Sequence, residues 1–199
     1  MPEDAMSDWP RYRLIQRLLH WGIALLVLPL IAVGIVLGIL GFQGAVDAFG
    51  FEATNTLYIT HKTGGVLVLG FMAVRIMARL RYGKPRYAIP LENRLQKIAS
   101  ESVHGLMYVA LIAMPALGWA ANATGGYPIN FFHWVLPPLM AENDALSAVF
   151  FQWHAIVGWT LLGLVSVHIA GALYHWFIRK DGVMTRMSLL PSPRPGQGD

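Results

Sequence analysis

Four long apolar stretches divide the chain, and they cover residues 14–40, 57–80, 103–122 and 149–178. A helix needs about 20 mainly apolar residues to cross about 30 Å of hydrocarbon. The pattern therefore predicts an all-α fold, an integral membrane four-helix bundle in contact with the lipid bilayer. The first stretch is too long for the apolar core of a signal peptide, which spans about 7–15 residues, and no A-x-A cleavage site follows it.

The segments around the apolar stretches set the expected domain organisation. We expect one four-span domain over residues 10–188, a polar N-terminal tail over residues 1–9 and a flexible, Pro- and Gly-rich tail over residues 189–199. A short amphipathic helix is expected to lead from Glu92 into the third span. The loop over residues 123–147 contains aromatic residues, which are typical of a membrane interface.

Composition supports the membrane class and excludes several chemistries. The chain is 55% hydrophobic and only 13% charged, against about 25% charged residues in a soluble domain. It contains no cysteine. Disulfides, Fe–S clusters, thiolate catalysis and covalent C-x-x-C-H haem attachment are therefore excluded.

The basic residues are unevenly distributed along the chain. Of the 15 Lys and Arg residues, all except Lys62 lie within residues 11–17, 75–97 and 179–194. With four spans, these three segments lie on one side of the membrane. The connections on the other side carry acidic residues, namely Asp47, Glu52, Glu142 and Asp144. The positive-inside rule then places both termini in the cytoplasm, and the distribution argues against nucleic acid as a partner.

Histidines recur at matching depths in the predicted spans. His154 and His168 are 14 residues apart on the fourth span, which places them on one helix face about 21 Å apart. By the same topology, His61 lies near the outer end of the second span and His20 near the inner end of the first. The sequence therefore predicts an outer pair, His61 with His154, and an inner pair, His20 with His168.

Facing imidazoles at two depths suit the axial positions of two haem irons, which would carry electrons across the bilayer. Three other interpretations stay open. A membrane histidine can simply hydrogen-bond to a neighbouring helix, and several can form a proton relay. A zinc site is also conceivable, although zinc favours four convergent ligands. Glycines beside the histidines would allow a flat macrocycle to approach the backbone, and these are Gly64, Gly65, Gly158 and Gly171.

Short motifs along residues 10–188 resemble the bacterial cytochrome b561 family, of the four-span di-haem type. The matching stretches are Arg17-Leu18-Leu19-His20-Trp21, His61-Lys62-Thr63-Gly64-Gly65, Arg75 through Arg79, His104, Pro115-x-x-Gly118, Trp153-His154-x-x-x-Gly158, Val167 through His175, Asp181 and Arg186-Met187. Each motif is short, and it is their order and spacing that is specific. The resemblance implies a multi-pass protein of the bacterial inner (cytoplasmic) membrane.

The resemblance also implies a cofactor set and an activity. Two non-covalent haem b groups are expected, the inner iron held by His20 and His168 and the outer iron by His61 and His154. Electrons would be exchanged with ubiquinone in the membrane as part of a respiratory chain. Superoxide as the outer donor would make the protein a superoxide:ubiquinone oxidoreductase, whereas a redox protein as donor would make it an electron carrier. The catalytic residues are unknown.

Two alternative functions remain at this point. Related cytochrome b subunits of hydrogenases and formate dehydrogenases share the histidine ligands but serve larger complexes, commonly with an extra span. A second alternative is a histidine-based metal transporter without haem.

Other polar residues are candidates for the surroundings of the haems. His175 lies seven residues, or about 10 Å, beyond His168. We therefore expect His175, together with His104, to line a quinone site, although both could instead reach lipid headgroups or haem propionates. Histidine can exchange the protons that quinone reduction consumes.

Basic residues near the spans are candidates for haem propionates. Arg75 and Arg79 lie four residues apart on one face of the second span, where anchoring to the membrane surface is an equally good interpretation. Lys62 is the one basic residue expected on the outer side, where it would pair with a propionate or attract an anionic donor. The loop residue His133 is expected to be structural.

Overall fold

Four long helices form the chain in a computed structural model that describes residues 11–85 and 94–190. They are α1 (Leu14–Phe49), α2 (Phe51–Tyr82), α3 (Arg94–Thr124) and α4 (Asp144–Leu173). Each is long and apolar enough to cross a membrane. The predicted all-α membrane bundle is therefore confirmed, while the predicted tail over residues 1–9, most of the tail over residues 189–199 and the residue Glu92 lie outside the described residues.

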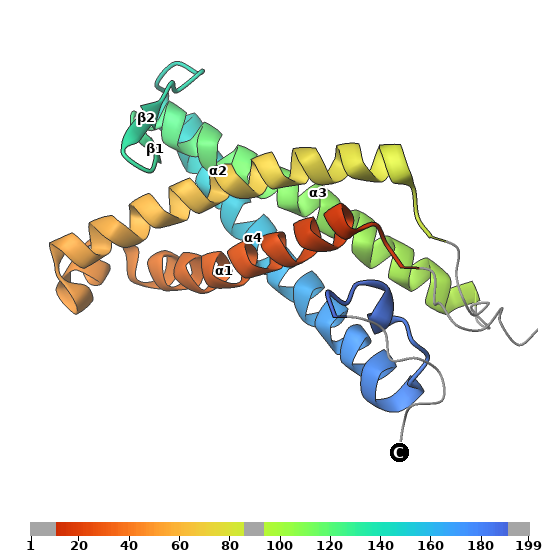
Figure 1. Ribbon diagram of the computed structural model, residues 1–199. Coiled ribbons are helices and arrows are strands. Elements are labelled where there is room, and N and C mark those ends of the chain that lie inside the picture. The colour runs from red at the N-terminus through yellow and green to blue at the C-terminus, as the bar shows by residue number, and fades with distance from the viewer. Residues whose placement is uncertain (1–10, 86–93, 191–199) are drawn as a thin grey trace, which may run out of the picture.

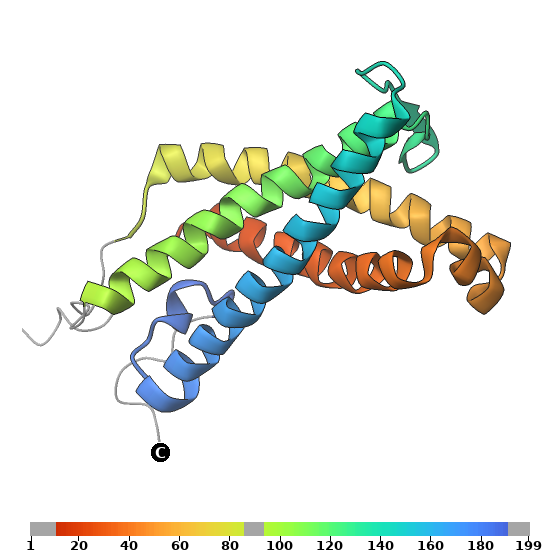
Figure 2. The same cartoon turned by 180° about the vertical axis from the view of Figure 1, so that it is seen from behind.

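The helices are arranged as two antiparallel hairpins that cross each other (Figures 1 and 2). α1 packs mainly against α2, and α3 packs mainly against α4. Between the hairpins, α2 contacts α3 closely, whereas α1 and α4 approach each other little. α1 and α4 are therefore each held mainly by the other helix of their own hairpin.

Two ends of the bundle are distinguished by what lies there. The start of α1 and the segment after α4 meet at one end, which we call the terminal end. At the opposite end, between α3 and α4, the chain forms a small antiparallel hairpin of β1 (Ile129–Phe131) and β2 (Trp134–Leu136). We call this the hairpin end. The aromatic loop expected at residues 123–147 is thus partly ordered as a β-hairpin.

The helices extend beyond the apolar stretches that predicted them. α1 continues past residue 40 to Phe49, with a break at Gly41, where φ is 64° and the backbone is not helical. Such a positive φ suits glycine because it has no Cβ. α3 begins at Arg94 and runs without interruption into the third span. α4 closes in a π-helical turn, η2 (Tyr174–Arg179).

A compact apolar core fills the middle of the bundle. Its buried members come in pairs from each helix, and they are Ile23, Val27, Val68, Met72, Ala110, Leu111, Leu161 and Val165. Met72 is fully buried, and Leu161 is only 2% exposed. Leu161 and Val165 lie between His154 and His168 in α4, so this core separates the two depths at which the histidines lie.

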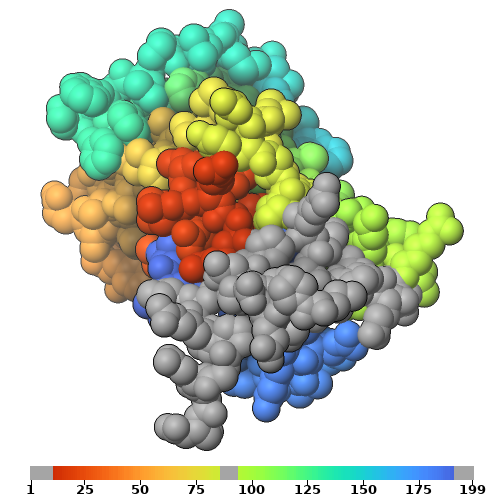
Figure 3. Space-filling view, turned by 45° about the vertical axis from the view of Figure 1, so that its right-hand side comes forward, coloured from red at the N-terminus to blue at the C-terminus, as the bar shows by residue number. Residues whose placement is uncertain are grey.

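The terminal end is closed by hydrogen bonds between distant parts of the chain. Figure 3 shows the start of α1 in red beside the end of α2 in yellow, and the Gln16 amide donates to the carbonyl of Gly83 at 3.1 Å. Arg17 donates from Nη1 to the carbonyl of Ser188 at 2.6 Å. Trp21 donates from Nε1 to the carbonyl of Met187 at 2.9 Å. The segment that follows α4 is therefore fixed to the first turns of α1.

Candidate functional site

Four membrane histidines meet in two pairs at two depths along α4. The terminal-end pair is His20 of α1 with His168 of α4, and the hairpin-end pair is His61 of α2 with His154 of α4. In both pairs the ring centres are 6.1 Å apart, with interplanar angles of 83° and 76°. The structure thus brings together the same partners that depth in the membrane predicts.

The distance within each pair fits one metal ion between two imidazoles. A metal–imidazole bond is about 2.0 Å long, and a ring nitrogen lies about 1 Å from the ring centre, so two rings on opposite sides of one ion have centres about 6 Å apart. Both pairs match this value. Among residues 11–85 and 94–190, no group of three or more His, Cys, Asp or Glu side chains is placed to hold a metal ion. The donor set therefore suits two axial ligands better than a tetrahedral zinc site.

The hairpin-end pair is positioned mainly by backbone and by close packing. His154 donates from Nδ1 to the carbonyl of Met114 at 2.9 Å. This bond places the ring hydrogen on Nδ1 and leaves Nε2 as the nitrogen that can bind a metal. A Cβ added to Gly118 would lie 3.1 Å from Cε1 of His154, so a larger residue at this position would displace the ring.

His61 is held by a second glycine contact. A Cβ built on Gly34 of α1 would lie 3.1 Å from Cε1 of His61. Nδ1 of His61 is buried and has no hydrogen-bond partner within the described part of the chain. Glycines on α1 and α3 thus bring their helices against the two rings of this pair.

The glycines singled out in the sequence serve other contacts. A Cβ on Gly64 would clash with the side chain of Leu30, and one on Gly158 would meet Met114. Gly65 faces Pro115 at an ordinary distance, and Gly171 has open space around it. Three of these glycines therefore face side chains of neighbouring helices, and Gly171 faces none. The glycines that touch histidine rings are Gly34 and Gly118, and the sequence did not indicate this contact.

The terminal-end pair is surrounded by polar side chains. Arg75 of α2 donates from Nε to the hydroxyl of Tyr108 of α3 at 2.9 Å, and its Nη2 approaches Nδ1 of His20 at 3.4 Å. A histidine that binds a metal through Nε2 carries a hydrogen on Nδ1, so it cannot accept there. With a metal bound, both Nη groups of Arg75 are then available to an anion, and Nη1 is already buried without a partner among the described residues.

Two further histidine rings, those of His104 and His175, lie toward the terminal end. The ring of His104 is 5.0 Å from that of His168, with its Nδ1 2.6 Å from the carbonyl of Ser100. His175 lies in η2, and its Nδ1 is 2.6 Å from Oδ2 of Asp181. The structure therefore places His104 directly beside the terminal-end pair, and His175 in a separate polar network farther along.

The remaining predicted residues have different surroundings. Lys62 is half-buried and donates from Nζ to the carbonyl of Pro128 at 2.8 Å, which ties α2 to the segment before β1. Within the described residues, the Arg79 side chain makes no hydrogen bond or ion pair. His133 lies in the turn between β1 and β2 with its ring 4.6 Å from that of Trp134.

An apolar pocket of about 290 Å³ opens at the terminal end. Its lining combines two tryptophans with the segment that follows α4, and the residues are Trp21, Trp176, Met184, Ser188, Leu189 and Leu190. Trp21 follows His20 in the chain, and Trp176 follows His175. The pocket can therefore hold an apolar ligand near the terminal-end pair. No sequence motif predicted it, because its walls form only when the segment after α4 packs against α1.

Comparison with known proteins gives a consistent result. A family model described as prokaryotic cytochrome b561 matches residues 11–188. Cytochrome b561 homolog 1 of Escherichia coli is 27% identical over 183 residues, which is 89% of this chain and 96% of the relative. A probable superoxide oxidase CybB of Yersinia pestis is 24% identical, covering 89% of this chain and 95% of its own length. Cytochrome b562 of Cereibacter sphaeroides is 27% identical, with 92% and 98% covered.

This family implies haem b and electron transfer across a bacterial membrane, and both fit the paired histidines on four spans. The match extends over nearly all of the described structure, including both histidine pairs. The chain therefore belongs to the prokaryotic cytochrome b561 family.

Proposed function

We propose that this protein transfers electrons across the bacterial inner membrane, from a donor at the hairpin end to ubiquinone at the terminal end. The observation that carries the proposal is the presence of two histidine pairs with the same 6.1 Å ring separation. They lie about 21 Å apart along α4, near opposite ends of the bundle. Two such pairs provide one redox centre near each membrane surface.

The residues present suit two non-covalent haem b groups. His61 and His154 would hold one, and His20 and His168 the other. Bound haem supplies one-electron chemistry at its iron, with a potential that depends on nearby charges and hydrogen bonds. Arg75 is proposed to contact a propionate at the terminal end because its Nη1 is buried without a partner among the described residues. In α3, Nε1 of Trp119, next to Gly118, is likewise buried without a partner in the described part of the chain.

The terminal end is proposed to be the cytoplasmic side. Arg11, Arg17, Arg75 and Arg79 all lie near it, as the positive-inside rule requires. Quinone is the proposed acceptor there, since His104 and His175 can exchange protons. The apolar pocket beside Trp21 and Trp176 is proposed to hold the ring or the isoprenoid tail of the quinone.

Superoxide is the proposed donor at the hairpin end, by analogy with the relative named a probable superoxide oxidase. Long-range attraction contributes little to this step, because Asp47, Glu52 and Asp144 lie at the same end. Lys62 is the basic residue available near His61, and its ammonium group has donors beyond the one that bonds to Pro128. A small anion would therefore be recognised locally.

A spectrum and a kinetic experiment test the proposal. Purified protein from haem-replete cells should show low-spin b-type bands on reduction with dithionite and about two haems per chain. A colourless protein would contradict haem binding and favour a histidine-based metal transporter.

Mixing the oxidised protein with superoxide tests the donor. Rapid haem reduction, followed by reoxidation on addition of a short-chain ubiquinone, is the expected result. Reduction only by a separate redox protein would make this chain an electron carrier or a subunit of a larger dehydrogenase or hydrogenase.

A further inference from the structure

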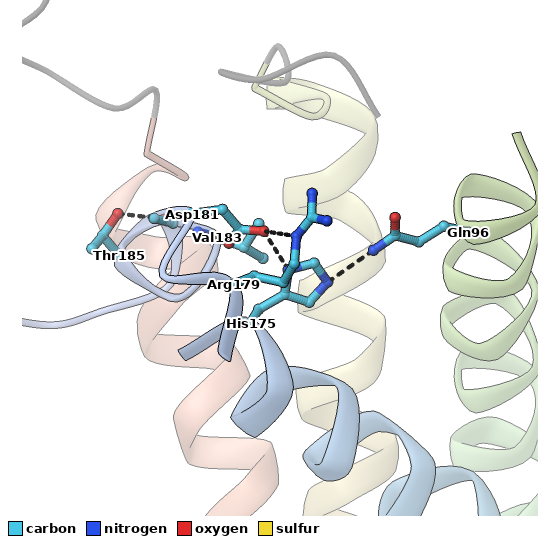
Figure 4. A network of polar contacts seen from close by, with 7 residues as sticks. Gln96, His175, Arg179, Asp181, Val183 and Thr185 are labelled. Atoms are coloured by element: carbon cyan, nitrogen blue, oxygen red, sulfur yellow. Dashed lines mark hydrogen bonds and ion pairs between the residues drawn. The ribbon is translucent and has the colours of Figure 1, made fainter. Parts of the chain in front are cut away.

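The chain reverses direction just after α4, and this reversal creates a polar network outside the histidine pairs (Figure 4). The π-helical turn η2 is followed by Lys180, whose φ of 49° and ψ of 38° are left-handed. π-helical turns occur frequently at functional sites. The turn brings the carboxylate of Asp181 to the ring of His175, with 2.6 Å between Oδ2 and Nδ1.

The carboxylate of Asp181 is itself fixed by two further groups. Oδ1 accepts a hydrogen bond from the backbone N–H of Val183 at 3.3 Å. Oδ2 lies 3.9 Å from Nε of Arg179, which adds a positive charge on the same side. Asp181 therefore has a defined orientation before any ligand arrives.

The contact with Asp181 determines which ring nitrogen of His175 carries the hydrogen and which one faces α3. A carboxylate only accepts, so the ring hydrogen lies on Nδ1. Nε2 is then an acceptor, and it points to α3, where the Gln96 amide nitrogen is 3.4 Å away. Figure 4 shows Gln96 and Asp181 on opposite sides of the ring. The two contacts agree on one tautomer, with Nε2 directed toward the start of α3.

Burial places this network at the boundary between protein and water. The side chains of His175 and Asp181 are 18% and 14% exposed. They are covered enough to keep their geometry, yet water still reaches them. His175 lies about 10 Å along the helix from His168, which is close to a redox centre but too far to bind its metal.

We propose that Asp181 is a positioning residue for the protonation of quinone by His175. The proposal rests on the proposed function, in which quinone is reduced at the terminal end. Asp181 keeps the hydrogen on Nδ1, so that Nε2 takes up a proton from water and gives it to a quinone oxygen. The carboxylate balances the charge of the ring while both nitrogens carry a hydrogen, and it does not itself become protonated.

The step balances over a full turnover. One quinone takes two electrons from haem b, one at a time, and two protons from water at the terminal end, and it leaves as quinol. The transfer from His175 breaks the N–H bond at Nε2 and forms an O–H bond on the nearer quinone oxygen, while the far oxygen takes its proton from water. Gln96 would yield its place at Nε2 to the quinone oxygen and remain nearby as a second hydrogen-bond donor.

The test compares Asp181→Asn with Glu101→Gln in the haem-loaded protein. Glu101 is a matched control, since it is a carboxylate of α3 whose side chain is 44% exposed and pairs only distantly with Lys84, at 4.0 Å. Two rates are measured by stopped flow, namely haem reduction by superoxide and haem reoxidation by a short-chain ubiquinone. Separating them distinguishes the donor side from the acceptor side.

We expect Asp181→Asn to keep its haem content, its spectrum and its rate of reduction by superoxide. Its maximal rate of reoxidation by quinone should fall about 10- to 100-fold, with the half-saturating quinone concentration changed less than about twofold. Asp181→Glu should recover much of the rate, and Glu101→Gln should match the unmodified protein. A purely structural role would not produce recovery by the longer carboxylate.

The possible failures are distinguishable. If the unmodified protein does not reduce quinone, the proposed acceptor is wrong and the role of Asp181 falls with it. If the unmodified protein reduces quinone and Asp181→Asn is as fast as Glu101→Gln, only the role of Asp181 is overturned. Should Asp181→Asn lose haem, Asp181→Glu decides the matter: a maximal rate at least about fivefold above that of His175→Ala supports the proposal, and an equal rate overturns it.

Discussion

The two histidine pairs have the same spacing but very different surroundings. At the hairpin end, His61 and His154 are positioned by two glycines and by the carbonyl of Met114. At the terminal end, His20 and His168 lie among Arg75, Tyr108 and His104, which bring a charge and several hydrogen-bonding groups.

This difference separates two ways of controlling a metal centre. Close packing fixes where a ring can lie, while a nearby charge changes how readily the centre gains an electron. A buried positive charge favours the form with one more electron. The terminal-end centre should therefore have the higher potential, which favours electron flow from the hairpin end toward the terminal end.

Removal of one ligand from each pair has the largest expected effect. His154→Ala and His168→Ala should each lower the haem content from about two to about one per chain. Each should also slow electron transfer from superoxide to quinone by more than about 100-fold. Haem content and the reduced spectrum measure the first result. Loss of both haems in either variant would show that the pairs do not form independently.

The packing at the hairpin end is tested by a pair of glycine variants on α1. Gly34→Val should displace the His61 ring and abolish binding of the hairpin-end haem, at a cost of about 1–3 kcal/mol in stability. Gly38→Val is the control, because a Cβ at Gly38 meets nothing within 4 Å. Equal haem content and equal thermal stability in the two variants would contradict the importance of close packing here.

The charge at the terminal end is tested by Arg75→Gln. Removal of this partly buried cation should lower the midpoint potential of the terminal-end haem while that of the hairpin-end haem stays nearly constant. A spectroscopic redox titration measures both potentials. Arg81→Gln, an exposed change near the end of the same helix, should shift neither. Equal shifts of both haems by Arg75→Gln would remove the contrast between the two centres.

The smallest effect is expected from Lys62→Gln. Lys62 holds the segment before β1 through one partly exposed hydrogen bond, so its loss should cost about 1 kcal/mol or less. Faster limited proteolysis of the loop would reveal this change. Haem reduction by superoxide should stay within about twofold, with a weaker dependence on salt. An unchanged rate and an unchanged salt dependence would exclude Lys62 from recognition of the anion.

Apolar patterning predicted the number and order of the helices, and topology predicted the partners of each histidine. Helix ends were less predictable. The short helix expected to lead into the third span is continuous with that span in α3, which begins at Arg94, because a helix can continue beyond the hydrocarbon layer with polar residues on its surface. The break in α1 at Gly41 is likewise invisible to an average over apolar residues.

Contacts between distant segments could not be predicted in the same way. The Arg75–Tyr108 bond joins α2 and α3, and its geometry depends on how these helices pack. The glycines that touch histidine rings lie on helices other than those of the rings, so adjacency in sequence identified the wrong ones. Asp181 was visible only as a short motif after the fourth span, and its contact with His175 needs the left-handed turn at Lys180.

The contribution of α4 to both pairs has a consequence for biosynthesis. Translation and membrane insertion deliver α1 and α2 first, with His20 and His61, but neither residue has its partner until the last helix is inserted. With the proposed haem ligands, each centre is therefore complete only after α4 has been inserted. A nascent chain stalled before α4 would hold no complete histidine pair. The visible absorption of bound haem would therefore show that α4 has been inserted.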